Sequence, residues 1–208
     1  MMNVSHKTGA YLLGVEVARI LATNAPSFNP LTGLIAIAVG ATIGASLPDA
    51  DTMNSRIGHK YALLLWPIWL IQSLVRLVSL IPGPFQRECR YLNKVTRHRG
   101  LAHTPIFWII IGTIPFVTTG IVLVTLKDLS SWFIVLVLGI YVGVISHLFL
   151  DWIFDGIMLL FPLTTKRFKL SPFHTGGFVE KLAFIAMVIL LVRATGSYIH
   201  INKLLEIV

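Results

Sequence analysis

Apolar stretches that alternate with short polar connections account for most of the chain, and a helix needs roughly 17–25 residues to cross a bilayer. We predict about five membrane-spanning helices from this pattern, at residues 9–23, 31–47, 104–126, 132–150 and 178–194. The second is rich in glycine and alanine, which let helices approach closely in lipid, so we expect it at the centre of the bundle. Thr104 and Pro105 form a capping residue and a first-turn proline at the start of the third.

A sixth apolar stretch, residues 61–81, contains Pro67 and Arg76 and is enriched in tryptophan by Trp66 and Trp69. If it crossed the membrane completely, the loops on its two sides would lie on opposite faces. A segment that enters and returns, or that lies along the interface, keeps these loops on one face, and tryptophan suits the interface. We therefore predict one re-entrant or interfacial segment in addition to the spans.

Lys and Arg residues concentrate in two of the connections. Residues 82–103 contain five of them, and residues 151–177 contain three. Cytoplasmic loops of membrane proteins carry an excess of Lys and Arg. Both connections are therefore expected in the cytoplasm, which places the N-terminus inside the cell and the C-terminus outside.

The composition supports the same class of protein. Hydrophobic residues make up 55% of the 208 residues, charged residues only 12%, and the mean hydropathy is +0.80. Because a soluble domain carries about 25% charged residues, we predict an all-α, polytopic membrane bundle with a single domain over residues 1–208. The net charge of +8 first suggests nucleic-acid binding. The basic residues flank apolar segments, however, so membrane lipids are the expected partners, with no nucleic acid. The oligomeric state stays open.

Candidate metal ligands occur in pairs at the ends of the apolar segments. His147 and Asp151 are four residues apart, which puts both side chains on one face of a helix, about 5–6 Å apart. Such a pair can hold one cation, or the carboxylate can orient the imidazole; a simple hydrogen bond at a helix end is the structural alternative. Asp49 and Asp51 follow the glycine-rich segment, where close packing would fix their direction, although many Asp-x-Asp pairs are only solvated turns.

The stretch of residues 97–105 combines His98, Arg99 and His103 with a glycine that permits a tight turn. Arg97 and Arg99 offer forked donors to an anion such as phosphate. A basic loop that contacts headgroups would explain the arginines but not the histidines. His6 gains significance only if it shares a side with the other groups, and His59 and His174 are further candidates.

The topology derived from Lys and Arg places all these groups at the cytoplasmic face. The expected metal ligands of this single cluster are His6, Asp49, Asp51, His103, His147 and Asp151. Imidazole and carboxylate without thiolate suit one or two divalent ions of Zn, Mn, Fe or Mg. No His-Glu-x-x-His, Cys-x-x-Cys, phosphate-binding loop or nucleophile elbow occurs in the sequence.

These elements resemble the LexA-regulated, inner-membrane-bound metal-dependent hydrolase family (YdjM-like). The similarity rests on the early His6, on residues 47–51, on the His-Arg-Gly-x-x-His-Thr element at 98–104, and on His147 with Asp151. The resemblance implies a multi-pass protein of the cytoplasmic membrane that uses a divalent metal for hydrolysis. A weaker similarity to zinc-dependent phospholipase C lacks many of that group's further ligands, so a three-zinc site is not expected.

We therefore expect a hydrolase that cleaves a phosphoester of an anionic lipid or lipid-linked substrate at the cytoplasmic membrane surface. In this hypothesis His98 protonates the leaving group and Arg99 neutralises the substrate. An ion or proton transporter that uses the same cluster is one alternative. A non-catalytic membrane scaffold, in which these residues cap helices or contact headgroups, is the other.

Overall fold

The structure is a computed structural model that describes residues 3–24, 30–51, 62–78, 80, 86–96, 99–111, 131–173 and 176–205. These residues form an all-α fold, as predicted, and their only β pairing is an isolated bridge between Ile157 and Phe168. The α-helices are α1 (Asn3–Asn24), α2 (Pro30–Gly44), α4 (Ala62–Val78), α5 (Gln86–Thr96), α7 (Ser131–Phe154) and α8 (Phe178–Leu205). Two 3-10 turns, η1 (Pro48–Asp51) and η2 (Leu101–His103), lie between them, and residues 105–111 are also helical.

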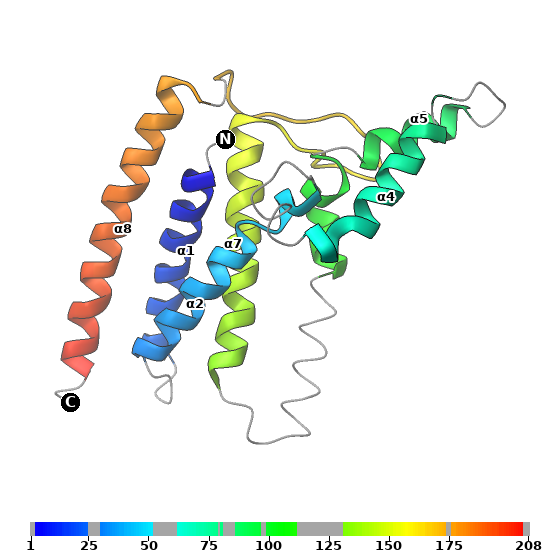
Figure 1. Ribbon diagram of the computed structural model, residues 1–208. Helices are drawn as coiled ribbons and strands as arrows, with labels where there is room; N and C mark the ends of the chain where they lie inside the picture. Colours follow the sequence, from blue (N-terminus) through cyan, green and yellow to red (C-terminus); the bar gives the residue numbers. More distant parts are fainter. Residues whose placement is uncertain are drawn as a thin grey trace.

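Four long helices form the body of the molecule. Helix α1 packs against α2, α7 and α8, and α2 packs along α7 (Figure 1). Helices α1 and α8 run in one direction and α2 and α7 in the other, so the start of α1 and the ends of α2 and α7 lie at the same end of the bundle, whereas the C-terminus lies at the other end (Figure 1). Chain segments that are far apart in sequence are thereby brought together at one end.

The contact between α2 and α7 depends on glycine. Gly40 and Gly44 on α2 face Gly139 and Gly143 on α7, and a Cβ atom at any of these positions would collide with backbone of the opposite helix. A Cβ at Gly139, for example, would lie 2.6 Å from the carbonyl oxygen of Ile37. The glycine-rich segment packs closely, as predicted, because only small residues allow backbones to approach like this. The predicted central position is not observed among the described helices, since α2 packs on α1 and α7 and exposes its other side, which carries Leu31, Ile35, Val39 and Ile43.

Two helical stretches of the described chain are long and apolar enough to cross a membrane, Leu31–Ala50 with 20 residues and Trp132–Phe154 with 23. They match two of the five predicted spans. Residues 112–130 of the predicted span 104–126 lie outside the described residues, but its start is confirmed: the Thr104 side chain caps the helix by accepting a hydrogen bond from the Phe107 amide at 3.3 Å. The number of crossings beyond these two stays a prediction.

Helix α4 corresponds to the predicted re-entrant or interfacial segment. Its 17 residues form one uninterrupted helix that contacts α5 and η1 and extends away from the four-helix body (Figure 1). Trp66, Leu70, Leu74 and Leu77 are all exposed, and their spacing of four, four and three residues places them on one side of the helix. Helix α4 is therefore amphipathic and presents an uncovered apolar stripe.

Candidate metal centre

The last two turns of α7 supply two side chains of the site. His147 and Asp151 are both buried, and the predicted spacing brings His147 Nε2 within 3.3 Å of Asp151 Oδ2. The other ring nitrogen of His147, Nδ1, donates a hydrogen bond of 2.6 Å to the carbonyl oxygen of Ala45. This bond, formed directly beyond the α2–α7 glycine crossing, fixes the tautomer and leaves the Nε2 lone pair directed into the site.

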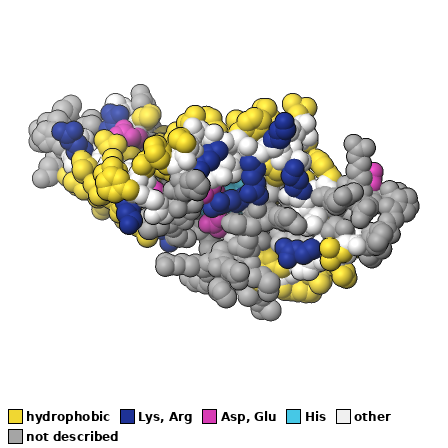
Figure 2. Space-filling model, turned by 90° about the horizontal axis from the view of Figure 1, so that it is seen from above, with side chains coloured by type: hydrophobic (Ala, Val, Ile, Leu, Met, Phe, Trp, Pro, Cys, Tyr) yellow, Lys and Arg dark blue, Asp and Glu magenta, His cyan; other side chains and the backbone are white. Residues whose placement is uncertain are grey.

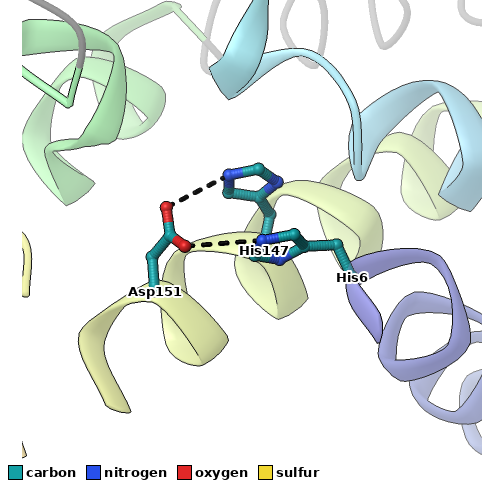
Figure 3. Close-up of side chains that lie close together, drawn as sticks. All are labelled: His6, His147 and Asp151. Atoms are coloured by element: carbon teal, nitrogen blue, oxygen red, sulfur yellow. Dashed lines mark ion pairs between the residues drawn. The ribbon is translucent and has the colours of Figure 1, made fainter. Parts of the chain in front are cut away.

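Helix α1 contributes the third group. The His6 ring stacks on the His147 ring at a centroid distance of 3.9 Å, and His6 Nε2 lies 3.4 Å from Asp151 Oδ1 (Figure 3). Gly9, one turn further along α1, makes this approach possible, since a Cβ there would lie 2.8 Å from Ser146 Oγ. The N-terminal histidine, which the sequence alone could not distinguish from an incidental residue, is therefore part of the cluster.

The two 3-10 turns supply the remaining described groups. His103 of η2 is completely buried, and its Nε2 lies 3.3 Å from Asp151 Oδ2 and 3.5 Å from Asp49 Oδ1 of η1. The Trp108 indole holds η2 in place by donating a 2.6 Å hydrogen bond to the carbonyl oxygen of Ala102. Asp49 is more exposed than the others, with 28% of its side chain accessible, so it lies on the open side of the cluster.

The distances in this cluster fit a bound divalent cation. Ligand atoms placed about 2.1 Å from a tetrahedral metal are separated from one another by about 3.4 Å. The five His-to-Asp contacts span 3.3–3.7 Å. Buried polar atoms normally have hydrogen-bond partners, yet His147 Nε2 and both Asp151 carboxylate oxygens make no hydrogen bond in the described part of the chain. A cation would satisfy these atoms together.

The donor atoms form two overlapping groups. One consists of His6, His147 and Asp151, and the other of Asp49, His103 and His147; within each group the donors lie within 4.8 Å of one another. Asp151 directs Oδ1 toward His6 and Oδ2 toward the other two imidazoles. The arrangement can thus hold one or two ions, with nitrogen and oxygen donors that suit Zn, Mn, Fe or Mg.

The structure therefore brings together five of the six predicted metal ligands. The backbone of Asp51 ends η1 beside Asp49, but its side chain lies outside the described residues, as do His98, His59 and His174. Their predicted roles stay predictions. The tight turn before His103 forms with Arg99 itself in the left-handed region, at φ 58°, a conformation that few residues other than glycine adopt.

Two charged groups at this end of the molecule were not assigned from the sequence. Asp155, one turn beyond Asp151, binds Arg99 through a 2.8 Å contact between Oδ2 and Nη2. Its spacing of eight residues from His147 could have indicated a third position on the same helix face. Seen from this end, Lys and Arg side chains gather around Asp or Glu and His side chains near the centre of the face (Figure 2).

The second unassigned group is Glu180, a fully buried carboxylate in the first turn of α8. Its Oε1 accepts a 3.2 Å hydrogen bond from the Ser5 hydroxyl, and its Oε2 accepts one of 2.6 Å from the Gly176 amide. Ser5 immediately precedes His6, so this carboxylate anchors the start of α1 at the site. The partners are 175 residues apart in the chain, and nothing local in the sequence indicates the contact.

Fold and site together define a helical membrane protein with a buried His/Asp cluster able to bind metal. The family model of the YdjM inner membrane proteins matches residues 1–206, and the chain belongs to that family, which confirms the resemblance inferred from the motifs. The chain is also similar to an uncharacterised protein, YvsG, of Bacillus subtilis (strain 168), with 27% identity over 155 residues, or 74% of each chain. No solved structure matches it.

Proposed function

We propose that this protein is a metal-dependent hydrolase that cleaves a phosphoester of a lipid or lipid-linked substrate at the cytoplasmic surface of the inner membrane. The observation that carries the proposal is the cluster of three imidazoles and two carboxylates, drawn from α1, η1, η2 and α7, with metal-like separations. Buried ionisable groups in membrane proteins are costly and mark functional sites.

Each residue of the site has a separate proposed role in metal binding or hydrolysis. His6, His103, His147 and Asp151 form the buried holding set, and Asp49 lies at its open side, where substrate and water can approach. When bound, a divalent cation supplies Lewis acidity and lowers the pKa of water toward about 7. Arg99, fixed by Asp155, neutralises the anionic group, and His98 is proposed to protonate the leaving group.

The location of the site supports action at the membrane surface. The cluster lies at the end of the four-helix body, and the basic residues of 151–177 lie at that same end, which the distribution of Lys and Arg assigns to the cytoplasm. The uninterrupted helix α4, with its exposed apolar stripe, suits an interfacial position better than a re-entrant one. We accordingly propose five spans with a cytoplasmic N-terminus.

The same structure favours hydrolysis over transport. An ion path would need polar groups that continue from the cluster through the membrane, along the helices on which the cluster is built. In the described part of the chain, α2 and α7 instead meet through direct backbone contact at four glycines, which leaves no space between the two helices at this crossing. The cluster is thus closed toward the α2–α7 crossing and open at Asp49, and this arrangement suits a reaction at the membrane surface.

The test is a measurement of metal content and turnover on the same preparations. Purified protein in detergent micelles is expected to contain at least one equivalent of divalent metal, and His147→Ala is expected to lose both metal and activity. Activity would be sought with phosphomonoester and phosphodiester amphiphiles, each with and without metal add-back. A wild-type protein that holds no metal after add-back would refute the proposal, and ion flux into liposomes without hydrolysis would favour transport.

A further inference from the structure

The face of α7 that carries the metal cluster continues toward the open end of the molecule. His147, Asp151 and Asp155 follow one another at intervals of four residues, and the Asp155 amide still donates a 2.8 Å hydrogen bond to the Asp151 carbonyl, as in a helix. At a rise of 1.5 Å per residue, Asp155 lies about 6 Å further along the axis than Asp151. Asp155 therefore lies one helical turn beyond the cluster, on the same side of the helix.

Arg99 lies beside Asp155, one helical turn beyond the metal cluster, and is held there by an ion pair. Its guanidinium binds Asp155, whose side chain is only 5% exposed, while 25% of the Arg99 side chain is accessible. The Nε–H group of Arg99 is buried and has no hydrogen-bond partner in the described structure. A buried donor left without a partner is costly, and on a guanidinium it is matched best by the oxygen of an anion.

A second arginine, Arg167, lies near the Arg99–Asp155 pair. Residues 164–171 return across the end of α7: Ile157 and Phe168 exchange backbone hydrogen bonds of 3.1 and 2.8 Å, and the Leu170 amide donates to the Trp152 carbonyl at 3.0 Å. This places Arg167, next to Phe168, beside the Arg99–Asp155 pair. Burial and the nearby charge of Arg99 lower the pKa of Arg167, while the carboxylates of Asp151 and Asp155 oppose that shift.

We propose that Arg99 and Arg167, with Asp155 fixing the first of them, bind the terminal phosphate of a phosphomonoester beside the metal cluster. The inference rests on the proposed function and narrows it from phosphoesters in general to monoesters. Two guanidinium groups and a cation present more positive charge and more donors than the two free oxygens of a diester can use. A terminal phosphate has three free oxygens and close to two negative charges. It can therefore contact both guanidinium groups and the cation at the same time.

The first experiment measures phosphate binding directly. Inorganic phosphate would be titrated calorimetrically into the metal-loaded, full-length protein in detergent micelles, for the wild type and for Arg99→Gln, Arg167→Gln and Asp155→Asn. Each arginine variant is expected to bind phosphate at least about tenfold more weakly, because each removes hydrogen bonds to a charged group. Lys166→Gln is the matched control: it removes the same charge at the neighbouring position, and it should bind phosphate as the wild type does.

Metal content, measured on every variant, separates loss of the phosphate site from loss of the fold. Arg167→Gln with full metal and weakened phosphate binding supports the proposal. Both arginine variants binding phosphate normally, or Lys166→Gln losing as much affinity as Arg167→Gln, would overturn it. If the phosphate site behaves as expected but the metal-loaded wild type cleaves no phosphoester, the proposed hydrolase function fails while the phosphate site stands.

The second experiment tests the choice of monoester. A matched amphiphile pair, identical except that one carries a terminal phosphate and the other its methyl diester, would be compared by kcat/KM. The monoester is expected to be preferred, and Arg167→Gln should reduce kcat/KM for it more than for the diester. A diester preference that survives in Arg167→Gln would refute the assignment of substrate class without affecting the metal centre.

Discussion

A single methyl group on a residue that is not itself a candidate metal ligand is predicted to weaken metal binding. In Gly44→Ala, the new Cβ on α2 would collide with the carbonyl oxygen of Ile140 on α7 and lie 2.8 Å from its carbonyl carbon and 3.0 Å from its Cα. Optimal carbon–carbon contacts are about 3.5 Å or longer, so relieving the contact with the carbonyl carbon alone moves α2 away from α7 by at least about 0.7 Å, and the closer carbonyl oxygen requires more. Overpacking of this kind typically costs about 1–3 kcal/mol.

The displaced backbone carries the neighbouring Ala45 carbonyl, which orients His147. A shift of at least about 0.7 Å would stretch its 2.6 Å hydrogen bond with Nδ1 to roughly 3.3 Å or more, past the usual range for such bonds. Loss of such an orienting partner typically lowers metal affinity about 10–100-fold. Gly44→Ala should therefore show a drop of this size although every ligand is intact.

The assay is a competition titration against a chromophoric chelator, on protein purified in detergent micelles. Gly196→Ala is the matched control, because a Cβ at that position of α8 meets no atom within 4 Å. The control should bind metal as the wild type does. Unchanged metal affinity in Gly44→Ala would refute the reasoning that the helix crossing positions the site.

Three further predictions concern the cluster and its support. Asp151→Asn should abolish stoichiometric metal binding, because this carboxylate faces all three imidazoles; retention of a full equivalent by elemental analysis would contradict its central role. Removal of metal by chelation should lower the melting temperature, since a ligand present at 100 times its Kd stabilises the folded state by about 2.7 kcal/mol; an identical melting curve after chelation and after metal add-back would argue against a metal centre. Glu180→Ala should destabilise the protein by about 1–3 kcal/mol, because it leaves the buried Ser5 hydroxyl and the Gly176 amide without their acceptor. Glu180→Gln should recover part of this loss in a thermal unfolding experiment, and equal melting temperatures for both variants would show that the hydrogen bonds contribute nothing.

The positions of most helices and the identity of most candidate metal ligands could be predicted from the sequence because both depend on local properties. Apolar length and the Thr104-Pro105 cap located the apolar helices, whereas the polar helix α5 lies inside residues 82–103, which were expected to be a connection. The spacing of four residues between His147 and Asp151 places their side chains on one face of the helix, and this does not depend on how the helix packs in the bundle. The alternation of charge among the connections then placed the remaining histidines and aspartates at the same end, and the described residues of that set do lie together.

Contacts between segments distant in the chain could not be predicted in this way. Neither the Ala45 carbonyl that orients His147, nor the Ser5–Glu180 bond, nor the Arg99–Asp155 pair has a local signal, since each depends on the separation of two helix or loop backbones. The sequence by itself thus determined an α-helical membrane protein with candidate metal-binding side chains at one end of its helices. Only the tertiary structure decided which of these side chains meet, because donor distances of 3.3–3.7 Å result from how closely α1, α2 and α7 can pack at their glycines.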